Sequence, residues 1–375
     1  MKRKLLYILI CLSTLTSCEK ELSYDPQDGQ GKLVMNALLQ TEEKCHYVYL
    51  TSSYSKKMKE LENAKLSCYV NDAYVAEAQI DTSYWTDAFY FDDGDITHKY
   101  IKKPVTRYKF NATFHPGDKI VLQAEANRGT LHATAEVIAP EQPTMIQQVD
   151  TSSVSRRIYE DRYEPYLKMM VHIRENNLDN QYYRLAVQVD KKRFMHADKS
   201  YRVPETDIVR EESKVLMIDS MDDPIISEGN VITNEEDDIW GTYVLNMYTV
   251  FTNVQFKGKD CTLRIYAPKN DMTSLENISN EYYTEPDEQH RREIIYFDNE
   301  RVERKLKVSL QNISKDHYMY LKAMNYLRYD NYEPALTEPI TIPNNVKEGL
   351  GFVGISTSST VYLDLPDLFI DYMFY

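Results

Sequence analysis

Apolar and polar residues alternate along many short segments of the chain, the period-2 pattern typical of half-buried β-strands. Within residues 66–70, Leu66 and Cys68 fall on one face, and the residues between them fall on the other. Asn71 and Asp72 follow directly and favour a tight turn into another strand. The pattern therefore predicts β-hairpins in the first part of the chain.

The clearest predicted hairpin spans residues 119–137. Two alternating segments flank Asn127-Arg128-Gly129, whose residue types suit a tight turn. Further predicted strands begin at residue 32, and Pro140 ends the pattern. Short strands at this spacing predict an N-terminal immunoglobulin-like β-sandwich over residues 32–140.

The remainder of the chain, residues 141–375, predicts a larger β-rich domain with one or more short helices, so the fold class is mainly β. Residues 167–173 alternate strictly, and we predict that they pair with residues 182–190 in a hairpin. Residues 191–235 are charged and irregular and are predicted to form long loops. One helix is expected after Ser314, a residue type that caps helix N-termini.

The first 17 residues combine a basic start, an apolar run at residues 5–12 and Leu15-Thr16-Ser17 directly before Cys18. This is the pattern of a secretory signal peptide that ends at a lipidated cysteine. The apolar run is shorter than the roughly 20 residues of a membrane span. We therefore predict a signal peptide over residues 1–17, an acyl anchor on Cys18 and a polar tether over residues 18–31.

The formal net charge of the chain limits the classes of binding partner that we expect. Residues 1–17 carry three basic residues and no acidic ones, so their removal changes the formal net charge from −14 to −17. Such an acidic protein is a poor match for nucleic acid or an anionic membrane surface. The chain also has 31 tyrosines, which suit strand surfaces and can also form an aromatic platform for a ligand.

Three cysteines remain after Cys11 is removed and Cys18 is acylated. Cys45 and Cys68 are predicted on neighbouring strands, where they either form a disulfide or stay as two buried thiols. Cys261 lies in a strand-like run and is most simply a small core residue. No C-x-x-C pair is present, so the sequence does not support a zinc knuckle or a redox motif.

Acidic clusters are the candidate metal ligands. Asp92, Asp93 and Asp95 are close enough in sequence to bind calcium, although they lack the register of an EF-hand loop. Residues 219–223 and 235–238 are similar clusters. For each cluster the alternative is a solvated loop, and otherwise the sequence predicts no cofactor.

The sequence carries neither the H-E-x-x-H motif of a zinc helix nor the G-x-S-x-G motif of a serine nucleophile, so we predict a protein without catalytic activity. Paired carboxylates for glycoside hydrolysis are defined by their separation in space. That class of enzyme therefore stays open at this stage.

Six segments resemble, in order, a lipoprotein family found mainly in Bacteroidetes and known as domain of unknown function 4249. They cover nearly the whole chain after the tether, and the last is the most specific. The segments are residues 33–39, 133–140, 180–185, 253–258, 314–321 and 338–354. The resemblance implies an outer-membrane lipoprotein, often associated with a TonB-dependent transporter, and it supplies no catalytic residues.

Three functions are consistent with these observations: a non-catalytic accessory lipoprotein that captures a ligand for a TonB-dependent transporter, a surface hydrolase acting on glycans, and an envelope-structural lipoprotein without a small ligand. The first is favoured by the anchor and by the missing catalytic motifs. Residues 19–21 are Glu-Lys-Glu, similar to a surface-export signal, which favours the cell surface over the periplasmic face.

Overall fold

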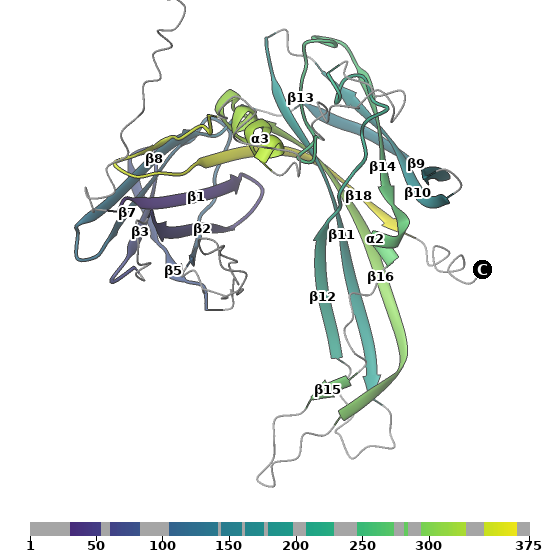
Figure 1. Cartoon of the computed structure of the whole chain (residues 1–375), viewed down its shortest axis with the longest axis horizontal. Helices are drawn as coiled ribbons and strands as arrows, with labels where there is room; N and C mark the ends of the chain where they lie inside the picture. The colour runs from purple at the N-terminus through teal and green to yellow at the C-terminus, as the bar shows by residue number, and fades with distance from the viewer. Residues whose placement is uncertain are drawn as a thin grey trace, which may run out of the picture.

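The computed structural model describes residues 31–53, 61–82, 105–141, 144–159, 162–175, 179–197, 208–228, 246–273, 281–283, 294–327 and 341–365. These residues form two β-sandwiches that lie side by side and share one sheet (Figure 1). The predicted fold class is confirmed. The chain is mainly β, and its N-terminal sandwich is followed by a larger β-rich region with short helices.

The N-terminal sandwich packs a five-stranded sheet, in the order β17-β8-β7-β3-β4, against the β1-β2-β6-β5 part of the shared sheet. Its core is formed by the inward faces predicted from the alternation, with Leu66, Cys68 and Leu122 buried. The strands from the first part of the chain are β1 (Leu33–Gln40), β2 (Cys45–Ser52), β3 (Lys65–Val70), β4 (Ala73–Glu77), β5 (Gln79–Ile80), β6 (Thr106–Asn111), β7 (Lys119–Ala126) and β8 (Leu131–Ile138).

Both predicted tight turns are present. Asn71 and Asp72 connect β3 to β4 with positive φ angles of 50° and 68°. Asn127, Arg128 and Gly129 turn the chain from β7 to β8, again with positive φ, and the ladder closes with Ala126 opposite Leu131. Asparagine, aspartate and glycine tolerate this left-handed backbone at low cost, which explains their use at these points.

Two strands from near the C-terminus complete the N-terminal sandwich. Strand β17 (Val346–Lys347) pairs with β8 in one sheet. The first part of β18 (Val353–Leu365) pairs in parallel with β1 in the other sheet, from Ala37 opposite Val353 to Gln40 opposite Ser356. The predicted first domain ends at residue 140. That boundary leaves out β17 and the first part of β18, which belong to the same sandwich.

The C-terminal sandwich packs a three-stranded sheet, β14-β10-β9, against β11, β16 and the second part of β18. Its core joins Leu167, Met169 and Val171 of one sheet to Leu306 and Val308 of the other. Its remaining elements are β9 (Met145–Tyr159), β10 (Arg162–Arg174), β11 (Tyr182–Ala197), β12 (Ile208–Val215), β13 (Val250–Thr252), β14 (Cys261–Pro268), α2 (Lys269–Thr273), β15 (Glu281–Tyr283) and β16 (Ile294–Ile313). Strands β11, β12 and β16 extend away from this body as a long ribbon (Figure 1).

The predicted hairpin between residues 167–173 and 182–190 is wrong. The first segment lies in β10, which pairs with β9 and β14, whereas the second lies in β11, which pairs with β12, β13 and β16. Both strands turn their apolar faces to the same core from opposite sheets. Alternation reveals which face is buried but not which strand is the neighbour, and this is the cause of the error.

The prediction that residues 191–235 form loops is also wrong in part. Strand β11 continues to Ala197, and β12 occupies residues 208–215. Charged side chains pair across this ribbon, as Lys192 does with Glu211, where the Nζ–Oε1 distance is 3.2 Å. Such cross-strand ion pairs stabilise a ladder without apolar alternation, so the strand pattern is hidden in the sequence.

The predicted helix is α3 (Lys315–Leu327), which packs where β18 passes from one sandwich to the other (Figure 1). Ser314 caps it as expected, because its Oγ accepts a hydrogen bond of 3.1 Å from the backbone N–H of His317. Within the described ranges, no helix combines the length and the apolar character that a bilayer span requires.

Candidate functional site

A cleft of about 820 Å³ lies beside the junction of the two sandwiches. Strands β1 and β2 form one wall, and Ser213 of β12 reaches the cleft from the other side. Tyr320 of α3 and Phe352, directly before β18, close one end. A cavity of this size is in the range of small-molecule sites, and we call it the junction cleft.

Strand geometry explains which residues of β1 and β2 line the junction cleft. Successive side chains alternate between the core and the outer face, so Met35 and Ala37 are buried while Leu38 points outward. On β2, Tyr47 and Tyr49 take the outer face in the same way. Leu38 is 43% exposed and Tyr47 is 40% exposed, so this wall offers accessible apolar surface.

A buried ion pair supports the tyrosines of this wall from the neighbouring strand β6. The guanidinium of Arg107 lies 4.5 Å from the ring centroid of Tyr47 and pairs with the carboxylate of Asp81. Asp81 is buried and also lies 3.5 Å from Nζ of Lys109. Arg107 and Lys109 therefore share the one carboxylate of Asp81, and Tyr47 is held from one side by a cation–π contact.

The other end of the junction cleft is aromatic. The rings of Tyr320 and Phe352 stack with centroids 4.3 Å apart and an angle of 7° between their planes. Burial raises the pKa of Tyr320, so its hydroxyl is neutral at physiological pH. The stack fixes the ring of Tyr320 in the lining of the junction cleft.

Short polar contacts fix the base of the junction cleft. In the turn between β1 and β2, the backbone N–H of Thr41 donates to the carbonyl of Ser356 at 3.0 Å. Glu43 lies 3.7 Å from Nζ of Lys307 on β16, and Glu42 accepts a hydrogen bond from the backbone N–H of Ser358. These contacts join the N-terminal sandwich to β16 and β18.

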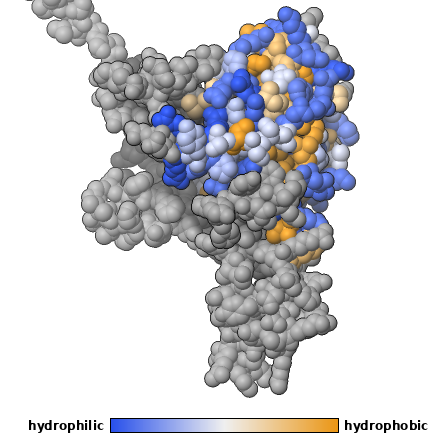
Figure 2. Space-filling model, turned by 90° about the vertical axis from the view of Figure 1, so that its right-hand side faces the viewer, coloured by the Kyte–Doolittle hydropathy of each residue, from blue (hydrophilic) through white to orange (hydrophobic). Residues whose placement is uncertain are grey.

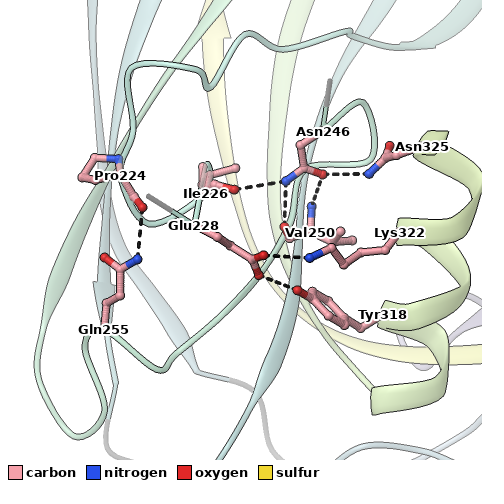
Figure 3. Close-up of polar contacts among 9 residues, drawn as sticks. All are labelled: Pro224, Ile226, Glu228, Asn246, Val250, Gln255, Tyr318, Lys322 and Asn325. Atoms are coloured by element: carbon pink, nitrogen blue, oxygen red, sulfur yellow. Dashed lines mark hydrogen bonds and ion pairs between the residues drawn. The ribbon is translucent and has the colours of Figure 1, made fainter. Parts of the chain in front are cut away.

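A polar network holds the other side of α3 (Figure 3). The amide of Asn246 donates to the carbonyls of Ile226 and Val250 at 3.2 and 2.7 Å. Its oxygen accepts hydrogen bonds from the backbone N–H of Val250 and the amide of Asn325, both at 3.1 Å. The loop before β13 is thereby tied to the helix that carries Tyr320.

Glu228 makes the second link in Figure 3. It accepts a hydrogen bond from the hydroxyl of Tyr318 and pairs with Nζ of Lys322 at 2.7 Å. Burial, and then the nearby carboxylate, raises the pKa of Tyr318 to about 12. The phenol therefore stays protonated and keeps donating to Glu228.

The inner side of α3 buries the imidazole of His317 near Arg184 of β11. The ring of His317 is 2% exposed, and burial, with a smaller effect of Arg184, lowers its pKa to about 3. Burial also lowers the pKa of Arg184, whose guanidinium lies 5.8 Å from the ring centroid of Tyr248. The imidazole is thus neutral and packs against β18. It is not one of the residues that line the junction cleft.

The predicted site residues fall in different places. Cys18, the predicted lipidation site, and Asp92, Asp93 and Asp95, the predicted calcium ligands, lie outside the described residues. Across the ranges that the structure describes, no group of three or more histidine, cysteine, aspartate or glutamate side chains is arranged to hold a metal ion.

The predicted pair Cys45 and Cys68 is not joined in the structure, where both are free thiols. Their strands are not neighbours, because β2 belongs to the shared sheet and β3 to the five-stranded sheet. Cys68 faces the core, whereas Cys45 lines the junction cleft on the outer face of β2. Cys68 therefore points into the sandwich and Cys45 points out of it. Both are free thiols, but the alternative of two buried thiols holds for Cys68 alone, because Cys45 is only half-buried.

The acidic cluster at residues 219–223 has structural roles. Asp219 and Asp222 each lie 2.9 Å from the guanidinium of Arg156. Buried Asp223 accepts hydrogen bonds from the backbone N–H groups of Ile225, Ile226 and Arg264. These carboxylates fold the loop and pair with a cation, so they are not free to act as a set of calcium ligands.

A smaller pocket of about 240 Å³ lies beside this cluster, lined by Met217, Met221, Met247 and Tyr166 among others. Figure 2 faces the side of the molecule that bears β9, β10 and β14 and shows separate hydrophobic patches among hydrophilic residues. Asp219 belongs to the lining of this pocket, and its carboxylate is paired with Arg156. The junction cleft, at about 820 Å³, is larger and gathers residues from both sandwiches, so it is the stronger candidate site.

The described lining of the junction cleft contains one carboxylate, Glu43. Glycoside hydrolysis typically uses two carboxyl groups on opposite sides of the scissile bond. The described lining instead combines tyrosine rings, amides and aliphatic side chains, which suit binding. Sequence reasoning named tyrosine as a candidate platform but not these positions. The lining residues of β1 and β2 share one feature: their side chains point away from the core. This feature can be recognised only once the buried face of each strand is known.

Fold and site together define an all-β protein of two joined sandwiches with an open, partly aromatic cleft at the junction. The chain belongs to the family described as Domain of unknown function (DUF4249), whose model matches residues 19–361. This confirms the resemblance found in the sequence. A comparison with curated proteins finds no match.

Among solved structures, the chain is similar at 8% identity to "Biofilm associated protein - B domain", with a TM-score of 0.16, covering 89% of this chain and 86% of that one. It is similar at 9% identity to "Biofilm associated protein - BSP domain", also with a TM-score of 0.16, covering 89% of this chain and 59% of that one. At such TM-scores the likeness carries no argument.

Proposed function

We propose that this protein is a non-catalytic lipoprotein of the outer membrane that captures a ligand in the junction cleft for a TonB-dependent transporter. The observation that carries the proposal is the cleft itself, about 820 Å³ in volume and lined by Tyr47, Tyr49 and Tyr320. Tyrosine presents an apolar face with a polar tip, a combination suited to reversible binding.

The lipobox supports the anchored part of this proposal. Acyl chains on Cys18 would hold the protein strongly, since each buried methylene contributes about 0.8 kcal/mol. The tether would keep the junction cleft close to the membrane and raise the local concentration of captured ligand there. The acidic residues after Cys18 favour the cell-surface face.

Gentle detergent extraction of cells with a tagged chain tests the partnership. We expect a TonB-dependent barrel, identified by mass spectrometry, to co-purify with the wild-type protein and to be lost with Cys18→Ala, which cannot be acylated. Protease shaving of intact cells should remove the protein if it faces outward. No barrel with the wild-type protein, under conditions that keep other envelope complexes intact, would contradict the transporter role and favour an envelope-structural role.

The second candidate function is that of a hydrolase, because the family to which the chain belongs has no known function. It predicts turnover of glycans by the purified chain and a loss of turnover with Glu43→Gln, because Glu43 is the carboxylate in the described lining. Ligand binding without turnover, unchanged by Glu43→Gln, is the result that a capture protein should give.

A further inference from the structure

The chemistry of the junction cleft narrows the class of ligand. We propose that the cleft binds a neutral oligosaccharide, with one sugar ring lying on the exposed face of Tyr47. This inference rests on the proposed capture function and adds the identity of the ligand class. Its basis is the distribution of rings, amides and charges in the described lining.

The rings supply stacking surfaces at two places. Tyr47 and Tyr49 stand two residues apart on the outer face of β2, a separation of about 7 Å along a strand. One side of the Tyr47 ring is held by Arg107, and 40% of the residue remains exposed. Tyr320 is fixed by its stack on Phe352. Rigid aromatic faces bind the C–H faces of sugar rings with little loss of conformational freedom.

Polar groups that donate and accept hydrogen bonds share the lining with these rings. Asn36 belongs to the lining, and its amide is held because its oxygen accepts a hydrogen bond of 2.9 Å from the backbone N–H of Phe352. Gln40 adds a second amide to the lining. Amides and phenols pair with hydroxyl groups without requiring a charge on the ligand.

Few ionised side chains lie at the junction cleft: its described lining contains Glu43 and no lysine or arginine, while Arg107 and Lys109 beside Tyr47 share the carboxylate of Asp81. Glu43 pairs with Lys307. An anionic or cationic ligand would have to compete with these existing partners. A neutral ligand leaves them in place, and this favours uncharged sugars over acidic ones.

A peptide is the main competing ligand, because an edge strand can accept an extended chain by pairing. In the described part of the shared sheet, β12 is the edge strand nearest the cleft, and its residues 210–214 are Arg-Glu-Glu-Ser-Lys. A charged edge of this kind discourages strand addition. The observations therefore favour stacking of a sugar over pairing of a peptide.

Isothermal titration calorimetry with the purified chain tests the proposal. The probes are neutral hexasaccharides of glucose, mannose and xylose, together with hexagalacturonate as the anionic probe and a mixture of polar decapeptides. We expect at least one neutral hexasaccharide to bind and hexagalacturonate to bind at least tenfold more weakly. Tyr47→Ala should weaken binding about tenfold, whereas Tyr47→Phe should stay within about threefold because the ring remains.

Two matched controls locate the binding. Ser213→Trp fills the junction cleft from β12 and should abolish binding, whereas Val215→Trp, two residues along the same strand and outside the lining, should not. Tyr163→Ala removes an exposed tyrosine from β10 and should leave affinity unchanged. Circular dichroism of each variant confirms that it is folded.

The outcomes separate the ligand class from the capture function. Stronger binding of hexagalacturonate or of the decapeptides, lost in Ser213→Trp, would overturn the sugar proposal and leave capture standing. Hexasaccharide binding that Ser213→Trp and Tyr47→Ala leave unchanged would overturn the assignment to this cleft. Absence of binding by any neutral hexasaccharide in the panel would also overturn the sugar proposal, while co-purification of the barrel tests the wider function independently.

Discussion

The imidazole ring of His317 lies so close to Gly354 that a Cβ built on the glycine would be 2.8 Å from Nδ1 of the histidine. His317 is in the first turn of α3, and Gly354 is near the start of β18. The ring also lies 5.7 Å from that of Phe352, measured between centroids. The missing side chain at position 354 therefore lets the helix sit directly on the shared strand.

We expect Gly354→Ala to lower the free energy of unfolding by about 1–3 kcal/mol, because the new methyl group overpacks a buried contact. Urea unfolding followed by circular dichroism measures the change. In a His317→Ala background the same substitution should cost much less, since the ring is gone. An equal cost in both backgrounds would show that the contact with His317 is not the cause.

Acid should destabilise the protein through the same histidine. Burial lowers the pKa of His317 from 6.5 to about 3, so between these values the unfolded chain binds a proton that the folded chain does not. Stability is therefore full above pH 6.5 and falls as the pH drops below it, by about 2 kcal/mol from this group at pH 5. Urea unfolding from pH 7.5 to 5 should show a steeper loss for the wild type than for His317→Leu. Parallel curves would contradict this.

Asn246→Asp should destabilise the tie between the loop and α3. The substitution replaces an amide N–H₂ that donates to the carbonyls of Ile226 and Val250 with an oxygen that faces both. We expect a loss of about 1–3 kcal/mol in unfolding free energy, the usual cost of disrupting such hydrogen bonds. Gln255→Glu is the matched control, because its amide donates to Pro224 at an exposed site. It should cost less than half as much in the same thermal or urea titration.

Thiol reactivity should distinguish the three cysteines that remain after residue 18. Burial raises the pKa of Cys68 and of Cys261 to about 12, so neither forms much thiolate at pH 8. Cys45 is half-buried and lines the junction cleft. With Ellman's reagent, a chain starting at residue 19 should release one equivalent quickly, and three after denaturation. Cys45→Ser should remove the fast phase, whereas a fast phase that persists would place the reactive thiol elsewhere.

Much of the local structure was predictable because it depends on neighbours in sequence. The turns at Asn71-Asp72 and Asn127-Arg128-Gly129 follow from residues that accept positive φ, and the Ser314 cap follows from a side chain that reaches its own helix. Sheet partners were not predictable in the same way. Strands β10 and β11 show the same alternation because both face one core, although they belong to different sheets.

The candidate site was hidden for a related reason. Its residues come from β1, β2, β12 and α3, which only the assembled sheet brings together. Tyr47 is one of 31 tyrosines in the chain, and no local motif distinguishes it from the others. The acidic residues at 219–223 stand out in the sequence, yet the fold uses them to pair with Arg156 and to bind backbone N–H groups.

The pairing of β18 with β1 has a consequence for the order in which the molecule is made. In this pairing Ala37 lies opposite Val353, and directly beside it the backbone N–H of Phe352 donates to the side chain of Asn36, 316 positions away. The first sandwich therefore remains incomplete during synthesis until β17 and the first part of β18 have emerged. A chain that stops before residue 346 would leave the edges of β1 and β8 open to aggregation. Termination just before residue 346 thus removes two strands of the N-terminal sandwich, although the break lies more than 200 residues after that sandwich begins.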